Sequence, residues 1–454
     1  MDTMGKLLII FTFSLCLCFL VALLYVFYKE AFIKPMALTH AIFPRVMPHV
    51  YSWINKYGKS YLSWNGVRPQ LVITDPEIVK EVLRNSEKAF PKGKPTNFFE
   101  KISKTGSKNI KHQEHKLLKI LGDGLVTTES EKWARQRKLA NYAFHGKSLK
   151  NMIPAVVVSV ETMLEKWKGR EGKEMEVFQE FTLLTSEVIS RTAFSSSYLE
   201  GEKIFDLLTK LSLIASRNVF KTRLPIISRF WKSSDEIELD KLAKMIYDSV
   251  MKIVKKREEI VTGEVDSFGN DFLGLLVNSY HDLDENKKLS IQDLVDESKT
   301  FYFAGQETTN SLLAWTILLL AVDTDWQEKA RREVIEIIGK GNPNSEGIAK
   351  LKTITMIINE TLRFYPPATG TIRKVEREVR LGKLVLPIDL EVNIRIHDPD
   401  LWGDDVHLFK PERFAEGISK ATNYNAAAFF PLDWDHDLPQ NGIQLLFHSL
   451  HDDA

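Results

Sequence analysis

The segment from Ile291 to Ala321 constrains the fold of this 454-residue chain more than any other part of the sequence. Its apolar side chains recur with helical periodicity, and at 1.5 Å per residue it predicts a helix roughly 45 Å long. A helix of that length crosses a whole domain. Helical periodicity dominates the entire stretch from Lys132 to about Ile338, including Met152–Trp167 and Leu239–Ile260.

Short strands are predicted before and after this helical stretch, in segments bounded by turn-forming residues. They lie at Ser63–Trp64, Leu71–Thr74, Val379–Leu381 and Leu384–Leu386. Many helices with a minority of short strands predict a mainly α fold with small β-sheets. Because no repeat and no long linker follows the N-terminal segment, residues 35–454 are interpreted as one large domain.

The composition excludes several classes of function. With 44% hydrophobic residues the chain can bury a large core, and its net charge of +1 argues against general nucleic-acid binding. A local basic run, Lys101–Lys119, is interpreted as a solvated loop. The only two cysteines, Cys16 and Cys18, precede the globular part. That part therefore has no disulfide framework and no cysteine-based zinc site, and no metal-ligating set is predicted.

Residues 1–34 are predicted to form a membrane anchor and a short hinge. The run from Leu7 to Tyr28 carries no charge, and as a helix it spans the roughly 30 Å hydrocarbon core of a bilayer. A cleaved signal peptide is the alternative, but its apolar region is shorter and ends in small residues rather than aromatic ones. Positive charges are more numerous after the run than before it, which predicts a single span with the large domain in the cytosol.

A chemically unusual motif, Ala304–Thr309, lies in the middle of the longest predicted helix. Gly305 and Thr308 are poor residues for a helix interior. Gly305 removes side-chain bulk where a flat group could approach the backbone, and the Thr308 hydroxyl can bond to a preceding carbonyl. Glu307 adds an ionisable group suited to proton transfer. A helix kink or a packing notch is the alternative interpretation.

Two further motifs combine charged and aromatic residues at helical spacing. Glu360 and Arg363 share one helical face, and Arg413, about fifty residues later, can complete a buried Glu–Arg–Arg cluster with a structural role. Trp133 and Arg137 are four positions apart and can face one anionic group. A surface stacking pair is the alternative for these two residues.

In this order, the motifs resemble the cytochrome P-450 family of haem-thiolate monooxygenases, and the resemblance extends from about Phe43 to Pro431. The strings LGDGLVTTESEKWARQRKLANYAFH, FYFAGQETTNSLLAW and LWGDDVHLFKPERFAEG are similar to a plant microsomal group that includes secologanin synthase-like and hormone-hydroxylating members. The resemblance implies the cytochrome P-450 fold, an N-terminal transmembrane helix and a location at the endoplasmic reticulum.

The resemblance also implies a haem cofactor and residues that hold it. Trp133 and Arg137 would bind one haem propionate, and Arg373 would bind the other. The Glu–Arg–Arg cluster would lock the fold around the haem.

Catalytic roles follow from the same resemblance. Gly305 would open room for dioxygen above the iron, while Glu307 and Thr308 would relay protons during its activation. Electrons would come from NADPH through a separate membrane-bound reductase, and the substrate would be a small lipophilic molecule of terpenoid or hormone-like type.

The family's cysteine-containing ligand loop, F-x-x-G-x-R-x-C-x-G, has no counterpart in this sequence. It should follow Ala428–Pro431, where the five defining positions hold other residues: Leu432, Asp435, Asp437, Pro439 and Asn441. The thiolate donates electron density to the iron, and proline cannot coordinate iron at all. His436 is the only alternative ligand nearby, and a solvated tail histidine is the competing interpretation.

The segment Asn441–His448 resembles the family's final strand, although the family places that strand much farther from the Phe-Pro element at residues 430–431. The ligand loop and the elements behind it, near 432–441, are therefore interpreted as deleted together, through a skipped exon or a faulty gene model. Two predictions remain: an active monooxygenase, or an inactive, haem-free truncated member of the family.

Overall fold

The computed structural model describes residues 48–65, 68–85, 88–92, 122–196, 198–217, 233–260, 267–285, 287–368, 370–395, 402–425 and 429. The chain divides into two compact units, Met1–Ser52 and Trp53–Ala454, and the second holds nearly all of the described residues. The predicted anchor, the basic run at 101–119 and the region near 432–441 with His436 lie outside the described residues. Within the described ranges, no helix is both long and apolar enough to cross a membrane.

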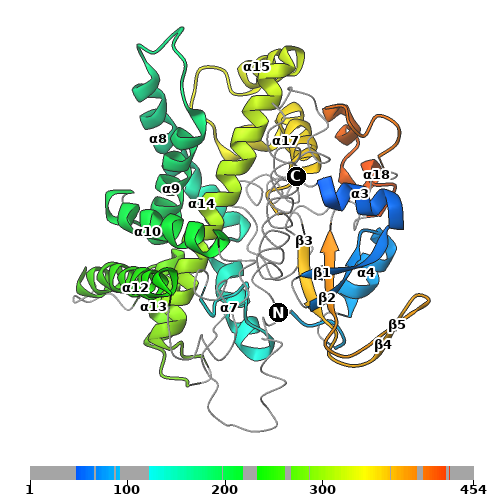
Figure 1. The fold of residues 1–454 in the computed structure, drawn as a ribbon. Helices are drawn as coiled ribbons and strands as arrows, with labels where there is room; N and C mark the ends of the chain where they lie inside the picture. The colour runs from blue at the N-terminus through cyan, green and yellow to red at the C-terminus, as the bar shows by residue number, and fades with distance from the viewer. Residues whose placement is uncertain are drawn as a thin grey trace, which may run out of the picture. The chain divides into compact units, whose positions relative to one another are not determined.

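The second unit is mainly helical, and α3 (Pro48–Tyr57) opens the described chain (Figure 1). The longer helices that follow are α4 (Pro76–Arg84), α7 (Ser130–Ala143), α8 (Gly146–Trp167), α9 (Val177–Phe194), α10 (Tyr198–Arg217), α12 (Ser234–Ile260), α13 (Phe272–Tyr280), α14 (Ile291–Val322), α15 (Thr324–Ile337) and α17 (Lys352–Phe364). Shorter helical turns are α16 (Ser345–Ala349), the 3-10 helix η2 (Pro411–Phe414) and α18 (Ile418–Ala421).

Helix α14 organises the packing of this unit. It is 32 residues long and starts with a capping box, in which Ser290 and Asp293 satisfy each other's backbone N–H groups. It packs against α9, α10, α12, α13, α15 and α17, and Figure 1 shows it running among them. The largest apolar cluster joins buried side chains of α7 to α10 and α12 to α14, so the helix is surrounded by core along its first half.

A four-stranded sheet forms the second structural layer, with strand order β1-β2-β6-β3. Strands β1 (Ser60–Asn65) and β2 (Arg68–Ile73) are antiparallel, and β2 lies parallel to β6 (Glu391–Arg395). Strand β3 (Gly370–Lys374) closes the sheet antiparallel to β6 and is buried mainly through Arg373. Strands β4 (Val379–Leu381) and β5 (Leu384–Leu386) form a separate hairpin.

The structure confirms the predicted mainly α fold with small sheets. The β4–β5 hairpin has the predicted bounds, and the long helix ends one residue beyond the predicted one. Two helices begin earlier than predicted, at Gly146 and at Ser234. Their first turns are polar, so hydrophobic periodicity alone does not detect them.

Candidate functional site

The Ala304–Thr309 motif lies in continuous helix at the centre of α14. The Thr308 hydroxyl donates a hydrogen bond of 2.6 Å to the carbonyl of Ala304, one turn back, which is the bond expected from its sequence position. Glu307 is half-buried, and this burial raises the pKa of its carboxyl above the ordinary value. Glu307 therefore keeps its proton to a higher pH than an exposed glutamate does.

Gly305 lies where α14 meets α9. A Cβ atom at this position would approach Cδ1 of Ile189 to 2.7 Å and Cγ1 to 2.9 Å, both closer than ordinary van der Waals contact. The missing side chain thus allows close packing of the two helices. This geometry supports the packing-notch interpretation that the sequence left open for Gly305.

Trp133 lies in the first turn of α7 and presents a buried hydrogen-bond donor. Its indole Nε1 has no hydrogen-bond partner among the described residues. Nζ of Lys92 lies 5.7 Å from the centroid of the Trp133 ring and donates to the carbonyls of Leu125, at 2.9 Å, and Thr128, at 3.0 Å. The Lys92 ammonium and the Trp133 indole therefore lie close together beside the segment that leads into α7. Arg137 follows one turn later on the same helix and is half-buried.

Arg373 belongs to β3 and is only 2% exposed. Its backbone forms an isolated antiparallel bridge with Lys92, and its guanidinium Nη1 lies 3.5 Å from the Thr371 hydroxyl. The strand that carries Arg373 therefore lies beside the segment whose lysine contacts Trp133. The structure brings these predicted cofactor-binding residues into one neighbourhood from widely separated parts of the sequence.

Glu360, Arg363 and Arg413 form a buried ionic cluster. Arg363 donates from Nε and Nη2 to the two carboxylate oxygens of Glu360, at 2.6 and 2.8 Å. Nε of Arg413 lies 3.5 Å from Oε1 of the same carboxylate, which is fully buried. The cluster predicted from the spacing of these residues is thus present. Its two cations and one anion are brought together by α17 and η2.

The two arginines of this cluster also tie down the chain that precedes η2. Arg363 donates to the carbonyls of Val406, at 3.0 Å, and Leu408, at 3.3 Å. Arg413 donates to the carbonyls of Trp402 and Asp405, and its guanidinium also pairs with the Asp405 carboxylate at 2.6 Å. Because each guanidinium satisfies several backbone carbonyls, the cluster orders a segment with little regular structure of its own.

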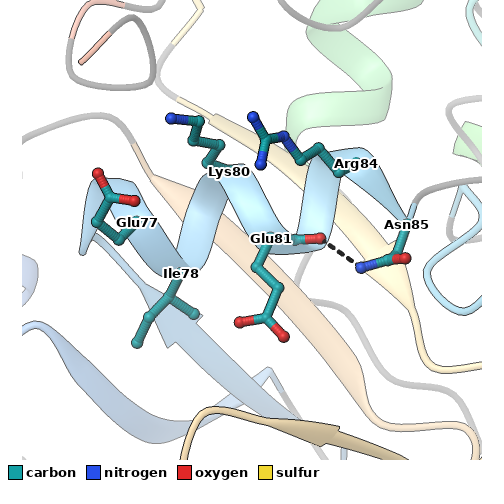
Figure 2. A pocket seen from close by; sticks show the side chains of 6 residues that line it. All are labelled: Glu77, Ile78, Lys80, Glu81, Arg84 and Asn85. Carbon is teal, nitrogen blue, oxygen red and sulfur yellow. Dashed lines mark hydrogen bonds between the residues drawn. The ribbon is translucent and has the colours of Figure 1, made fainter. Parts of the chain in front are cut away.

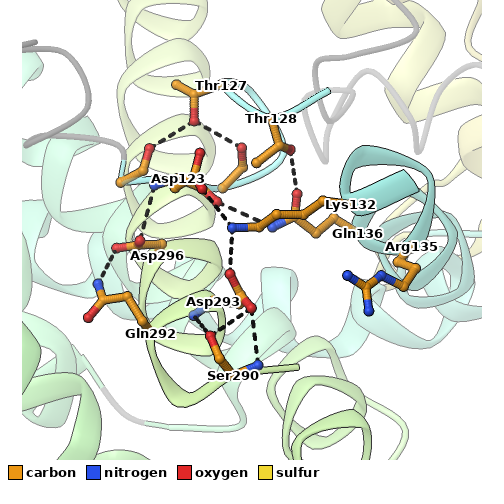
Figure 3. A network of polar contacts seen from close by, with 12 residues as sticks. Asp123, Thr127, Thr128, Lys132, Arg135, Gln136, Ser290, Gln292, Asp293 and Asp296 are labelled. Carbon is orange, nitrogen blue, oxygen red and sulfur yellow. Dashed lines mark hydrogen bonds and ion pairs between the residues drawn. The ribbon is translucent and has the colours of Figure 1, made fainter. Parts of the chain in front are cut away.

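A second polar network, which the sequence did not predict as a site, joins the loop before α7 to α14 (Figure 3). At its centre Nζ of Lys132 lies 2.8 Å from Asp123 and 2.5 Å from Asp293. Glu297 follows Asp293 by one helical turn and is 1% exposed. The available sequence signal was the presence of three acidic residues within five positions at the start of an otherwise apolar helix.

A small surface hollow lies along α4 and is unrelated to these motifs (Figure 2). Its lining side chains come from α4 and its C-cap: Glu77, Ile78, Lys80, Glu81, Arg84 and Asn85. No residue predicted to bind the cofactor or take part in catalysis lines it, and its wall is one face of a single helix. It therefore contributes nothing to the candidate site.

The fit of a haem to these residues is partial. The buried Trp133 N–H group without a partner and the buried Arg373 suit the acidic edge of a porphyrin. No cysteine follows Cys18 in the sequence, so no thiolate from the folded region can reach an iron. The described residues also contain no cluster of three or more His, Cys, Asp or Glu side chains able to hold a metal ion.

Comparison with known proteins gives a consistent match in sequence. The family model described as "Cytochrome P450" matches residues 45–431. "Cytochrome P450 CYP749A22" from Panax ginseng is 54% identical over 410 residues, covering 89% of this chain and 75% of that protein. "11-oxo-beta-amyrin 30-oxidase" from Glycyrrhiza uralensis is 40% identical over 409 residues, covering 86% of this chain and 73% of that protein.

The match extends to solved structures. "Crystal structure of cytochrome P450DA heme domain" superposes with a TM-score of 0.72 at 19% identity, covering 90% of this chain and 85% of that chain. "Retinoic acid bound cyanobacterial CYP120A1" superposes with a TM-score of 0.71 at 20% identity, covering 91% of this chain and 87% of that chain. At such low identity these superpositions establish the shared fold alone.

Proposed function

The chain belongs to the cytochrome P450 family of monooxygenases, which are oxidoreductases, and from that premise we propose that it oxidises a small terpenoid-like or hormone-like lipophilic molecule. The related 11-oxo-beta-amyrin 30-oxidase supports the terpenoid class. The structural observation that carries the proposal is the buried Trp133 N–H group, which has no partner among the described residues and lies beside Lys92. Such a donor is stabilised by an anionic group placed against it.

In this proposal Trp133 and Arg137 bind one haem propionate and Arg373 binds the other. When bound, the haem would supply the oxygen-activating chemistry, with electrons from NADPH through a separate reductase. Arg373 contributes a charge that is already desolvated by the fold, so less solvent must be removed from it when an anion binds. The cluster of Glu360, Arg363 and Arg413 holds the surrounding chain in place through its bonds to backbone carbonyls.

The Ala304–Thr309 motif of α14 would take part in proton transfer. The raised pKa of Glu307 lets its carboxyl hold a proton closer to neutral pH, as a group that delivers protons requires. Because the Thr308 hydroxyl donates to the Ala304 carbonyl, its oxygen lone pairs remain oriented to accept a hydrogen bond. Gly305 allows close packing of α14 against α9, because Ile189 fills the space that a side chain would occupy.

We further propose that residues 1–34 anchor the protein in the membrane of the endoplasmic reticulum. The uncharged run from Leu7 to Tyr28 supports this placement, and the positive residues that follow it favour a cytosolic position for residues 35–454. A lipophilic substrate dissolved in the bilayer would then be close to the enzyme.

A haem titration of the full chain in detergent tests the proposal, together with a reduced carbon-monoxide difference spectrum. Uptake of haem with the Soret band typical of thiolate ligation would support the monooxygenase. Trp133→Phe should weaken haem uptake without destabilising the haem-free protein, because the substitution removes a buried donor that has no partner among the described residues. Equal haem affinity in both proteins would contradict the assignment of Trp133.

A second candidate function is favoured by the cysteine count. Since Cys16 and Cys18 are the only cysteines, the chain would be a haem-free family member without monooxygenase activity. No haem signal from protein that is clearly present would support this candidate. Source transcripts that restore a cysteine-containing loop after Pro431 would overturn it and support an altered gene model.

A further inference from the structure

The loop that leads into α7 lies directly on the first half of α14. Gly122 has a left-handed φ of 72°, and a Cβ there would collide with the side chain of Asp296. A Cβ on Gly124 would come within 2.5 Å of the Thr300 hydroxyl oxygen. Between them, the backbone N–H of Asp123 donates to Oδ2 of Asp296 at 3.1 Å. The loop and helix are therefore in contact without intervening side-chain bulk.

Lys132 links this loop, α7 and α14 (Figure 3). Its Nζ bridges Asp123 of the loop and Asp293 of the helix, while its own backbone belongs to the first turn of α7. Gln136, one turn farther along α7, donates to the carbonyl of Asp123 at 3.4 Å and accepts a hydrogen bond of 2.5 Å from Thr128. We call these contacts of Lys132 and Gln136 with the loop and with α14 the α7–α14 clasp. Trp133 follows Lys132 directly in the sequence, so the clasp sets the position of its turn.

Glu297 lies under this clasp without a counter-charge of its own. It is one turn from Asp293, on the same face of α14, and among the described residues no side chain hydrogen-bonds to its carboxylate, which faces the backbone N–H of Leu125. Both neighbouring lysines are already engaged. Lys132 pairs with Asp123 and Asp293, and Lys299 pairs with Asp296 at 2.6 Å, with both partners buried.

The charges around Glu297 therefore do not balance if it ionises. Three aspartates share the two lysine ammonium groups, and a fourth carboxylate would be a buried negative charge without compensation. Such a charge is strongly destabilising in a protein interior, whereas the neutral acid is much less so.

We infer that Glu297 is protonated while the α7–α14 clasp is closed, and that Lys132 and Glu297 together position α7, with Trp133, against α14. The electrostatics agree with this inference, because burial raises the pKa of Glu297 to about 8. The Leu125 amide and the charge of Lys132 oppose this increase, and Asp293 and Asp296 add to it. The role of Trp133 towards haem rests on the proposed function, but the closing of the clasp does not.

The direction of the pH effect follows from the pKa of Glu297 in the two states. In the open state the contacts of the clasp are broken and water reaches Glu297. The pKa of Glu297 then returns towards the ordinary value of 4.5. Between pH 4.5 and 8 the open state therefore releases a proton that the closed state keeps. The opening constant should rise about tenfold per pH unit across this window and level off above pH 8.

Asp293 and Lys132, which lie next to Glu297, keep their charges in this window. Burial opposes the charge on Asp293, but hydrogen bonds from Lys132 and Ser290 outweigh it, so the pKa of Asp293 is lowered. Burial also opposes the charge on Lys132, and its bonds to Asp123 and Asp293 outweigh that effect and raise its pKa. A pH-dependent opening near neutrality can therefore be assigned to Glu297.

Hydrogen exchange of the full chain in detergent, measured from pH 6 to 9 and corrected for intrinsic exchange rates, tests the inference. Peptides covering residues 122–140 should lose protection as pH rises to 8, while peptides of α15 serve as the internal control. Glu297→Gln should hold 122–140 protected with no such pH dependence. Lys132→Met should open the segment at every pH, and Lys132→Arg should largely restore it.

A flat wild-type profile, or a Glu297→Gln profile that follows the wild type, would overturn the inference. If Glu297→Gln loses protection in α15 as well, it has not folded, and the wild-type profile alone decides. A haem titration on the same samples separates the two proposals. A pH-dependent clasp in a protein that takes up no haem would refute the proposed function and leave the clasp intact.

Discussion

Two helical glutamates, Glu360 in α17 and Glu297 in α14, are almost completely removed from solvent and differ in every other respect. Glu360 accepts two hydrogen bonds from Arg363 and one of 2.8 Å from the backbone N–H of Lys410, and it pairs with Arg413. Among the described residues Glu297 has no side-chain hydrogen-bond partner, and Asp293 and Asp296 are its neighbours.

The difference shows that a buried glutamate can either hold chain segments together as a charged group or make stability depend on pH as a neutral one. Where cations and donors surround a buried carboxylate, its charge holds several chain segments together. Where carboxylates outnumber cations, the group remains buried only as a neutral acid, and its ionisation opposes folding. The stability of the Glu297 region should therefore depend on pH near neutrality.

The largest effect on stability is expected from removing the charge of Glu360. Glu360→Gln leaves Arg363 and Arg413 buried with a neutral partner, and it should lower the free energy of unfolding by about 3–5 kcal/mol. Urea unfolding followed by circular dichroism would measure this change. Glu328→Gln, on the exposed face of α15 beside Arg331 and Arg332, is the matched control and should change little. Similar losses in both variants would contradict the comparison.

A pH series of unfolding sharpens the contrast for Glu297. Its folded-state pKa of about 8 lies above the ordinary 4.5, so its favourable contribution is present below pH 4.5 and is lost as pH rises to 8. Across this window the wild type should lose up to about 1.4 kcal/mol per pH unit from this group. Glu297→Gln should be flatter by that amount, and parallel curves would argue against a neutral buried Glu297.

Adding a side chain at Gly305, against Ile189, should have a smaller effect on stability, because the cause is steric rather than electrostatic. Gly305→Ala should lower the free energy of unfolding by about 1–3 kcal/mol, because the new Cβ meets Cδ1 of Ile189 at 2.7 Å. Ile189→Val removes that atom and should recover part of the loss in the double variant. Gly341→Ala is the control, since the nearest atom to its Cβ would be 3.9 Å away. Additive effects would show that the contact is not limiting.

The smallest effect is expected at the start of α14, where the cap precedes the clasp. Ser290→Ala removes the hydroxyl that accepts from the Asp293 backbone N–H, and it should lower the free energy of unfolding by about 1 kcal/mol. Ser290→Thr retains a hydroxyl and should remain close to the wild type. Thermal unfolding of the three proteins would measure the difference, and equal losses in both variants would exclude the cap as its source.

Sequence spacing predicted the cluster around Glu360 but not the buried, neutral Glu297. Glu360 and Arg363 are three positions apart in a helical pattern, so their pairing needed only local geometry, and Arg413 was identified from its place in the motif order. Glu297 carries no such local signal. Among the described residues its carboxylate has no side-chain partner, because the loop at 122–128, far earlier in the sequence, covers it and because Lys132 and Lys299 pair with other carboxylates.

The sequence by itself determined the mainly α fold, the long helix α14, the order of the motifs and the family, because hydrophobic periodicity and short motifs act over a few residues. It also established that no cysteine follows Cys18. Only the tertiary structure decided that Gly305 packs on Ile189, that Lys92 approaches Trp133, and that Glu297 is buried with no side-chain partner among the described residues. Burial and charge balance depend on which distant segments meet, and a linear pattern of residues does not contain that information.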